Sequence, residues 1–94
     1  MTASFDMRIA AAPDVMFRTV GEESVLLHLK TETYLGLDPV GTRMWTLLTG
    51  SDSIQCAYEA LLKEYEVDGQ QLRLDLEDFV GKLVEHELVQ VNAN

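Results

Sequence analysis

The sequence predicts an α+β fold, in which a three-stranded antiparallel sheet is followed by three helices. Two observations carry this prediction. Short runs rich in β-branched and apolar residues, joined by tight turns, occupy residues 15–37. Beyond that point apolar residues recur every three or four positions in three stretches, each preceded by a capping residue. Strands that precede helices, rather than alternate with them, are typical of α+β domains.

The first strand is expected over Val15–Val20, "VMFRTV", after an irregular arm formed by residues 1–13. The sequence "GEES" then supplies a turn, and "VLLHLKT", Val25–Thr31, forms the second strand of a hairpin. Glu32 marks another tight turn, and Thr33–Leu37 is the third strand. Three short strands joined in this way predict an antiparallel meander.

The first helix is expected over residues 39–50, with Asp38 as its N-cap and a proline at its first position. Further helices are expected over residues 54–65 and 69–87, and a last extended piece over residues 87–91. A small sheet cannot bury its face alone, so the helices must cover it. The predicted domain therefore has the shape of a winged helix-turn-helix, and residues 1–94 form one domain.

The charge balance disfavours nucleic acid as a partner. The chain has 7 Lys+Arg against 16 Asp+Glu, a net charge of −9, whereas affinity for nucleic acid depends on cations that displace counterions from phosphates. A basic or amphipathic peptide is a more natural partner. No run approaches the ~20 apolar residues of a membrane span, and Asp6 and Arg8 interrupt the position of a signal peptide's apolar core. With a single cysteine, Cys56, the sequence predicts a cytoplasmic protein.

The sequence shows no catalytic or metal-binding arrangement. Cys56 and His86 are isolated, and His28 is expected as a ladder or surface residue of its strand. Asp75 and Asp78 crowd one helix, where they form a solvated face rather than an acid–base pair. We therefore expect no enzyme, no metal and no cofactor.

The stretch "TETYLGLDPVGTRMWTLL", residues 31–48, carries a family pattern in its aromatic, glycine and leucine positions. With the later segments Leu61–Asp68 and Asp75–Val89, it resembles the PqqD family, the small protein D of pyrroloquinoline quinone biosynthesis and its relatives, over about residues 8–91. The residues that carry the pattern are Tyr34, Gly36, Leu37, Gly41, Met44, Trp45, Leu47 and Leu48.

The resemblance implies a winged helix-turn-helix domain that binds the leader segment of a ribosomally synthesised precursor peptide. Such a domain presents the leader to a modifying enzyme or a leader protease. An acidic, free-standing copy is also similar to the recognition protein of lasso peptide clusters, which works with a separate cysteine protease and a cyclase. The resemblance implies no catalytic role for the domain itself.

The third strand suggests how such a peptide would bind. We expect it to be a sheet edge, to which an extended peptide can add as a further strand, with the third helix as the other wall of a groove. Thr33, Tyr34 and Leu35 are expected to supply the pairing backbone of this edge. Leu35→Pro, which adds strain and removes an N–H at the edge, is therefore expected to abolish leader binding. Without a peptide, the same edge can pair two copies into a homodimer. The expected peptide-binding residues are Glu32, Thr33, Tyr34, Leu35, Gly36, Leu72, Asp75, Leu76, Phe79, Val80 and Leu83.

Two alternatives remain open at this point. A winged-helix DNA-binding transcriptional regulator would place the third helix in the major groove, using Gln70, Gln71, Arg73 and Lys82. Several acidic residues on the same helix oppose that role. A small enzyme would need a convergent polar cluster, which the sequence does not offer.

Overall fold

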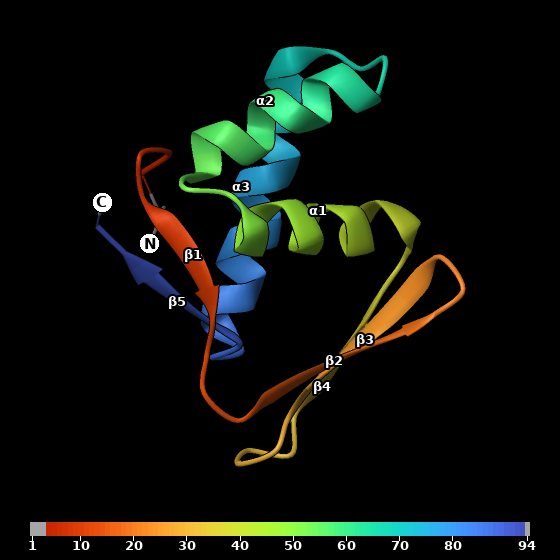
Figure 1. The fold of residues 1–94 in the computed structure, drawn as a ribbon, viewed down its shortest axis with the longest axis vertical. Helices are drawn as coiled ribbons and strands as arrows, with labels where there is room; N and C mark the ends of the chain where they lie inside the picture. The colour runs from red at the N-terminus through yellow and green to blue at the C-terminus, as the bar shows by residue number, and fades with distance from the viewer. Residues whose placement is uncertain (1–3, 94) are drawn as a thin grey trace.

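The three-stranded sheet has the predicted meander order. The computed structural model describes residues 4–93 and contains a sheet β2-β3-β4 formed by Val15–Val20, Glu23–His28 and Tyr34–Leu37 (Figure 1). The second strand begins and ends earlier than expected, because residues 29–33 form the turn. There Glu32 has a φ of 61°, and its N–H donates to the His28 carbonyl at 2.8 Å. The α+β prediction is confirmed.

One face of this sheet packs on the first helix, α1 (Pro39–Gly50). Leu26 and Ser24 of β3 are buried on this inner face, and the Ser24 hydroxyl lies 2.7 Å from that of Thr42 in α1. Phe17 of β2 stacks on Trp45, with ring centroids 5.9 Å apart. These contacts hold the β2-β3-β4 sheet, which we call the wing, against α1.

His28 also lies on the inner face. It pairs with Val15 in the β2–β3 ladder, as a ladder residue should, but it is buried rather than at the surface. Its Nδ1 accepts hydrogen bonds from the N–H groups of Lys30 (3.2 Å) and Thr31 (3.4 Å). The buried imidazole closes the turn that leads to β4.

The three helices begin at side-chain caps. The helices are α1, α2 (Ile54–Glu64) and α3 (Gly69–Glu85). Asp38 accepts from the Gly41 N–H at 2.7 Å, Ser53 from Cys56 and Asp68 from Gln70. Such caps satisfy N–H groups that have no partner within the helix. None of the helices found between residues 4 and 93 is long and apolar enough to cross a bilayer.

A second sheet corrects the prediction of an irregular arm over residues 1–13. Arg8–Ala11 forms β1, which pairs antiparallel with β5 (Val89–Asn92) near the other end of the chain. Ile9 of β1 is fully buried. In Figure 1 this strand pair lies beside the helices, on the side away from the wing. Residues 1–3 of the arm lie outside the described residues.

The segment before β1 is also part of the folded body. The carbonyls of Phe5 and Met7 accept the N–H groups of Gln55 and Ile54, each at 2.8 Å. These N–H groups belong to the first turn of α2, so the arm completes the cap of that helix. The Phe5 ring is buried against Tyr58 and lies under the Arg73 guanidinium, 3.9 Å from its carbon.

Candidate functional site

The outer side of β4 is a free sheet edge. Within residues 4–93, β4 pairs only with β3. The His28 N–H donates to the Thr33 carbonyl at 2.8 Å, and hydrogen-bonded pairs alternate along an antiparallel ladder. In this register Leu35 and Leu37 also direct their backbone groups toward β3. Tyr34 and Gly36 therefore direct their N–H and C=O groups to the open side.

This alternation corrects part of the sequence prediction. Thr33, Tyr34 and Leu35 were expected to supply the backbone of the edge, but Thr33 and Leu35 face β3. The pairing residues of the open side are Tyr34 and Gly36. A proline at Leu35 would break the β3–β4 ladder instead of removing an edge N–H, so it cannot test binding at the edge. Which β4 residues face the open side depends on where the turn over residues 29–33 ends, because the direction of the backbone groups alternates along the strand.

A groove begins at this edge and continues between α1 and α3. Three adjoining pockets form it, with volumes of about 160, 320 and 330 Å³. The first two share Gly41, Phe79 and Lys82, and the last two share Val40 and Met44. We call this continuous feature the α1–α3 groove. Its lining residues are Leu35, Gly36, Leu37, Asp38, Val40, Gly41, Met44, Leu61, Tyr65, Val67, Asp68, Gln71, Leu72, Asp75, Asp78, Phe79 and Lys82.

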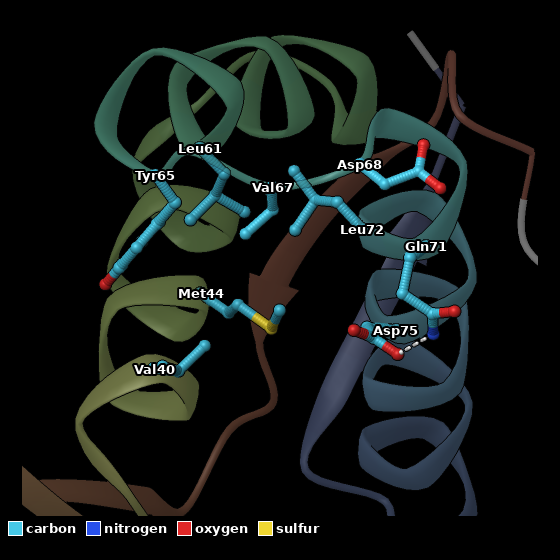
Figure 2. A pocket seen from close by; sticks show the side chains of 9 residues that line it. All are labelled: Val40, Met44, Leu61, Tyr65, Val67, Asp68, Gln71, Leu72 and Asp75. Atoms are coloured by element: carbon cyan, nitrogen blue, oxygen red, sulfur yellow. Dashed lines mark hydrogen bonds between the residues drawn. The ribbon is translucent and has the colours of Figure 1, made fainter.

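The pocket farthest from β4 is the most apolar part of the groove. Figure 2 shows side chains from all three helices converging on it, with Asp68, Gln71 and Asp75 at its α3 side. Gln71 Nε2 donates to Asp75 Oδ1 at 2.9 Å. The pocket can accept an apolar side chain. Its apolar walls are Val40, Met44, Leu61, Tyr65, Val67 and Leu72.

Only some of the predicted α3 residues reach the groove. Phe79 is half-buried, Asp75 is exposed and Leu72 lines the apolar pocket. Leu76, Val80 and Leu83 are 0%, 3% and 0% exposed and line none of the three pockets. Their stripe of α3 packs into the core, so they are not available to a ligand in this structure. The neighbouring row of α3, which includes Asp75, Phe79 and Lys82, forms the groove wall instead.

The remaining expected residues lie around the strand. Glu32 is exposed in the turn before β4 and Thr33 is half-buried, and neither lines the groove. The prediction missed the α1 side of the groove, where Val40 and Met44 contribute. Val40 is 44% exposed and Val67 is 50% exposed. Exposed valines beside helix ends are a weak signal in the sequence, because only the packed structure shows that they face each other across a pocket.

The groove is acidic. Asp38, Asp75 and Asp78 line its middle pocket together with one cation, Lys82. One Asp38 oxygen is occupied by the Gly41 N–H. The groove therefore favours a peptide with an apolar side chain and with Lys or Arg nearby.

Comparison with known proteins places this geometry in a family. The model of the PqqD family, described as coenzyme PQQ synthesis protein D, matches residues 23–89. The chain belongs to the PqqD family. That match covers β3, β4 and the three helices, and so includes the edge and both walls of the α1–α3 groove. A search of curated proteins found no match.

Two solved structures resemble this PqqD-family chain. One, of TbiB1 in complex with the TbiA(beta) leader peptide, shares 38% identity and a TM-score of 0.81. The similarity covers 86% of this chain and 94% of that one. The other, a lasso peptide synthetase B1 complexed with the leader peptide, shares the fold at 21% identity and a TM-score of 0.77, over 90% of this chain and 98% of that one. Nothing in the comparisons supports the DNA-binding alternative.

Proposed function

We propose that this PqqD-family domain binds the leader segment of a ribosomally synthesised precursor peptide by strand addition to β4. The observation that carries the proposal is the free edge of Tyr34 and Gly36 directly beside the α1–α3 groove. An extended peptide at this edge would direct alternate side chains into the groove. Both similar structures are complexes in which a leader peptide is bound to the protein.

Micromolar binding of a leader requires both the β4 edge and the α1–α3 groove. Each backbone hydrogen bond of strand addition contributes a net ~1 kcal/mol, whereas micromolar binding needs ~8 kcal/mol. Two or three buried side chains, at ~1.5–3 kcal/mol each, supply the difference. The proposed contacts are therefore the Tyr34 and Gly36 backbone and the groove side chains Leu72, Asp75 and Phe79.

The domain's proposed role is non-catalytic. It would hold the leader so that a separate modifying enzyme, or a leader protease and cyclase of the lasso type, acts on the rest of the precursor. The β4 edge offers backbone hydrogen bonds, and the α1–α3 groove offers apolar surface and negative charge. Together these features suit the recognition of a peptide.

The test of binding is a titration followed by amide hydrogen exchange. A labelled leader from the short precursor encoded nearest this gene is titrated with the protein, with a scrambled leader as control and the TbiA(beta) leader as a second probe. We expect saturable binding at micromolar or tighter concentration. Bound leader should slow exchange of the Tyr34 and Gly36 amides, while the Leu35 amide, already directed to β3, changes little. Binding without protection of Tyr34 and Gly36 would rule out strand addition.

The groove is tested by Phe79→Ala. Losing most of one buried aromatic contact should weaken leader binding about tenfold or more. Leu74→Ala is the matched control, because Leu74 is on the same helix, is 55% exposed and lines none of the three pockets. Urea denaturation of both variants separates a binding loss from unfolding. Equal affinity of the folded Phe79→Ala variant and wild type would remove the groove from the proposal.

A further inference from the structure

The turn that leads to β4 is built around one residue, His28. Three successive N–H groups, those of Lys30, Thr31 and Glu32, donate to it. The first two bond to its Nδ1 at 3.2 and 3.4 Å, and the third bonds to its carbonyl at 2.8 Å. The His28 N–H also donates to the Thr33 carbonyl across the turn. The bonds at Nδ1 require a neutral imidazole that carries no proton on this atom, since only that form has an acceptor there.

The two ends of β4 are held by different contacts. At its end, Leu37 is buried and the next residue, Asp38, caps α1. At its start, Tyr34 is 74% exposed, so its own side chain contributes little to holding the strand in place. Tyr34 is one of the two residues that direct their backbone groups to the open side. The turn around His28 therefore holds the half of the free edge that α1 does not.

We propose that His28 is a positioning residue for the leader-binding edge, and that protonation of its imidazole releases the start of β4; this inference rests on the proposed strand addition. His28 is 5% exposed. A proton on Nδ1 would make this atom a donor that faces two N–H donors, and a buried donor without an acceptor is costly. The turn would open and Tyr34 would lose its orientation, whereas Gly36, nearer the α1 cap, would keep its own.

The charged groups around His28 do not remove this conflict at Nδ1. Those on the adjoining turns are two acids and a lysine with exposed side chains, and α1, which packs on β3, adds one arginine that is bound to Glu64. The acids favour a cationic imidazole and the lysine opposes it, but solvent screens exposed charges. The two N–H donors contact Nδ1 directly. The charged residues are Asp14, Lys30, Glu32 and Arg43.

The test compares His28→Asn and His28→Leu with wild type. The Asn side-chain oxygen is as many bonds from the backbone as Nδ1 and can accept the same N–H groups, but it does not become charged. Leucine keeps the position apolar and accepts nothing. His86→Asn is the matched control, because it removes the other histidine of the chain, which caps α3 and lines none of the three groove pockets.

Each protein is titrated with a histidine-free leader at pH ~7.5 and at pH ~5.5, the range in which imidazoles gain a proton. Wild type and His86→Asn should bind about tenfold more weakly at the lower pH, because binding then requires the release of one proton. His28→Asn should change by less than about threefold over the same range. His28→Leu should bind weakly at both pH values. Circular dichroism checks that each protein is folded.

Amide hydrogen exchange of the free protein tests the turn without a leader. At pH ~5.5 the Lys30 and Thr31 amides should exchange faster in wild type than in His28→Asn, while the Leu26 amide in the middle of β3 exchanges equally in both. Equal exchange of Lys30 and Thr31 in the two proteins would show that protonation does not open the turn.

The outcomes separate this inference from the proposed function. If folded wild type binds no leader at pH ~7.5, the proposed function fails and this inference falls with it. If leader binds at that pH, but weakens equally in wild type and His28→Asn as the pH falls, only the role of His28 is refuted. Should His28→Leu fail to fold, the comparison of wild type with His28→Asn still decides.

Discussion

The Arg43 guanidinium joins α1 to the last turn of α2 through the Glu64 carboxylate. Arg43 Nε donates to the two Glu64 oxygens at 2.9 and 3.0 Å, and a terminal guanidinium nitrogen lies 2.7 Å from Oε1. These hydrogen bonds hold the pKa of Glu64 below its ordinary value of 4.5, and they raise the pKa of Arg43. The pair is solvent-exposed, so salt should screen it.

Because the pKa of Glu64 is lowered in the folded state, the free energy of unfolding depends on pH. The stabilisation by its carboxylate is present above the unfolded-state pKa and is lost as pH falls through the lower folded-state pKa. Glu64→Gln should therefore lower the free energy of unfolding slightly at pH ~7 and have no effect at pH ~2, in urea denaturation at low salt. Glu66→Gln, an exposed neighbour, is the control. An equal penalty for Glu64→Gln at both pH values would show that its carboxylate charge is not the cause.

At the scale of elements, β1 is the part that the sequence could not predict. The segment "RIAA" offers one large apolar side chain, and its partner β5 lies near the other end of the chain. Without that partner the alternation of apolar and polar residues is too short to indicate a strand. The β2-β3-β4 meander and the helices were predictable, because their turns, caps and periodicities are local. The groove was only partly predictable, since helical periodicity does not separate the buried stripe of α3 from the row beside it.

Because β1 packs into the core, truncating its buried side chain should destabilise the whole fold. Ile9 is 0% exposed, so Ile9→Ala should lower the free energy of unfolding by about 2–5 kcal/mol, through lost burial and a residual cavity. Arg8→Ala, an exposed change in the same strand, should stay within about 0.5 kcal/mol of wild type. Urea denaturation compares the two. A small effect of Ile9→Ala would mean that β1 is not part of the cooperative fold in solution.

At the scale of the whole molecule, the free β4 edge can also accept a second copy of the chain. In a two-fold antiparallel arrangement centred on Leu35, Tyr34 of each copy would exchange N–H···O=C bonds with Gly36 of the other. These bonds contribute ~1 kcal/mol each, against an association cost of ~4 kcal/mol or more. Two copies with a net charge of −9 each also repel one another. We therefore expect a monomer at micromolar concentration.

Salt should have opposite effects on self-association and on leader binding at the β4 edge. Screening weakens the repulsion between copies, so self-association should grow with salt, whereas a Lys- or Arg-bearing leader should bind the acidic groove less tightly. Sedimentation at about 10 µM and about 1 mM protein, in low and high salt, measures the first effect, and leader titration in the same buffers measures the second. Added leader should dissociate any dimer, because both need the same backbone groups. A tight dimer at micromolar concentration that persists with saturating leader would place self-association on another surface.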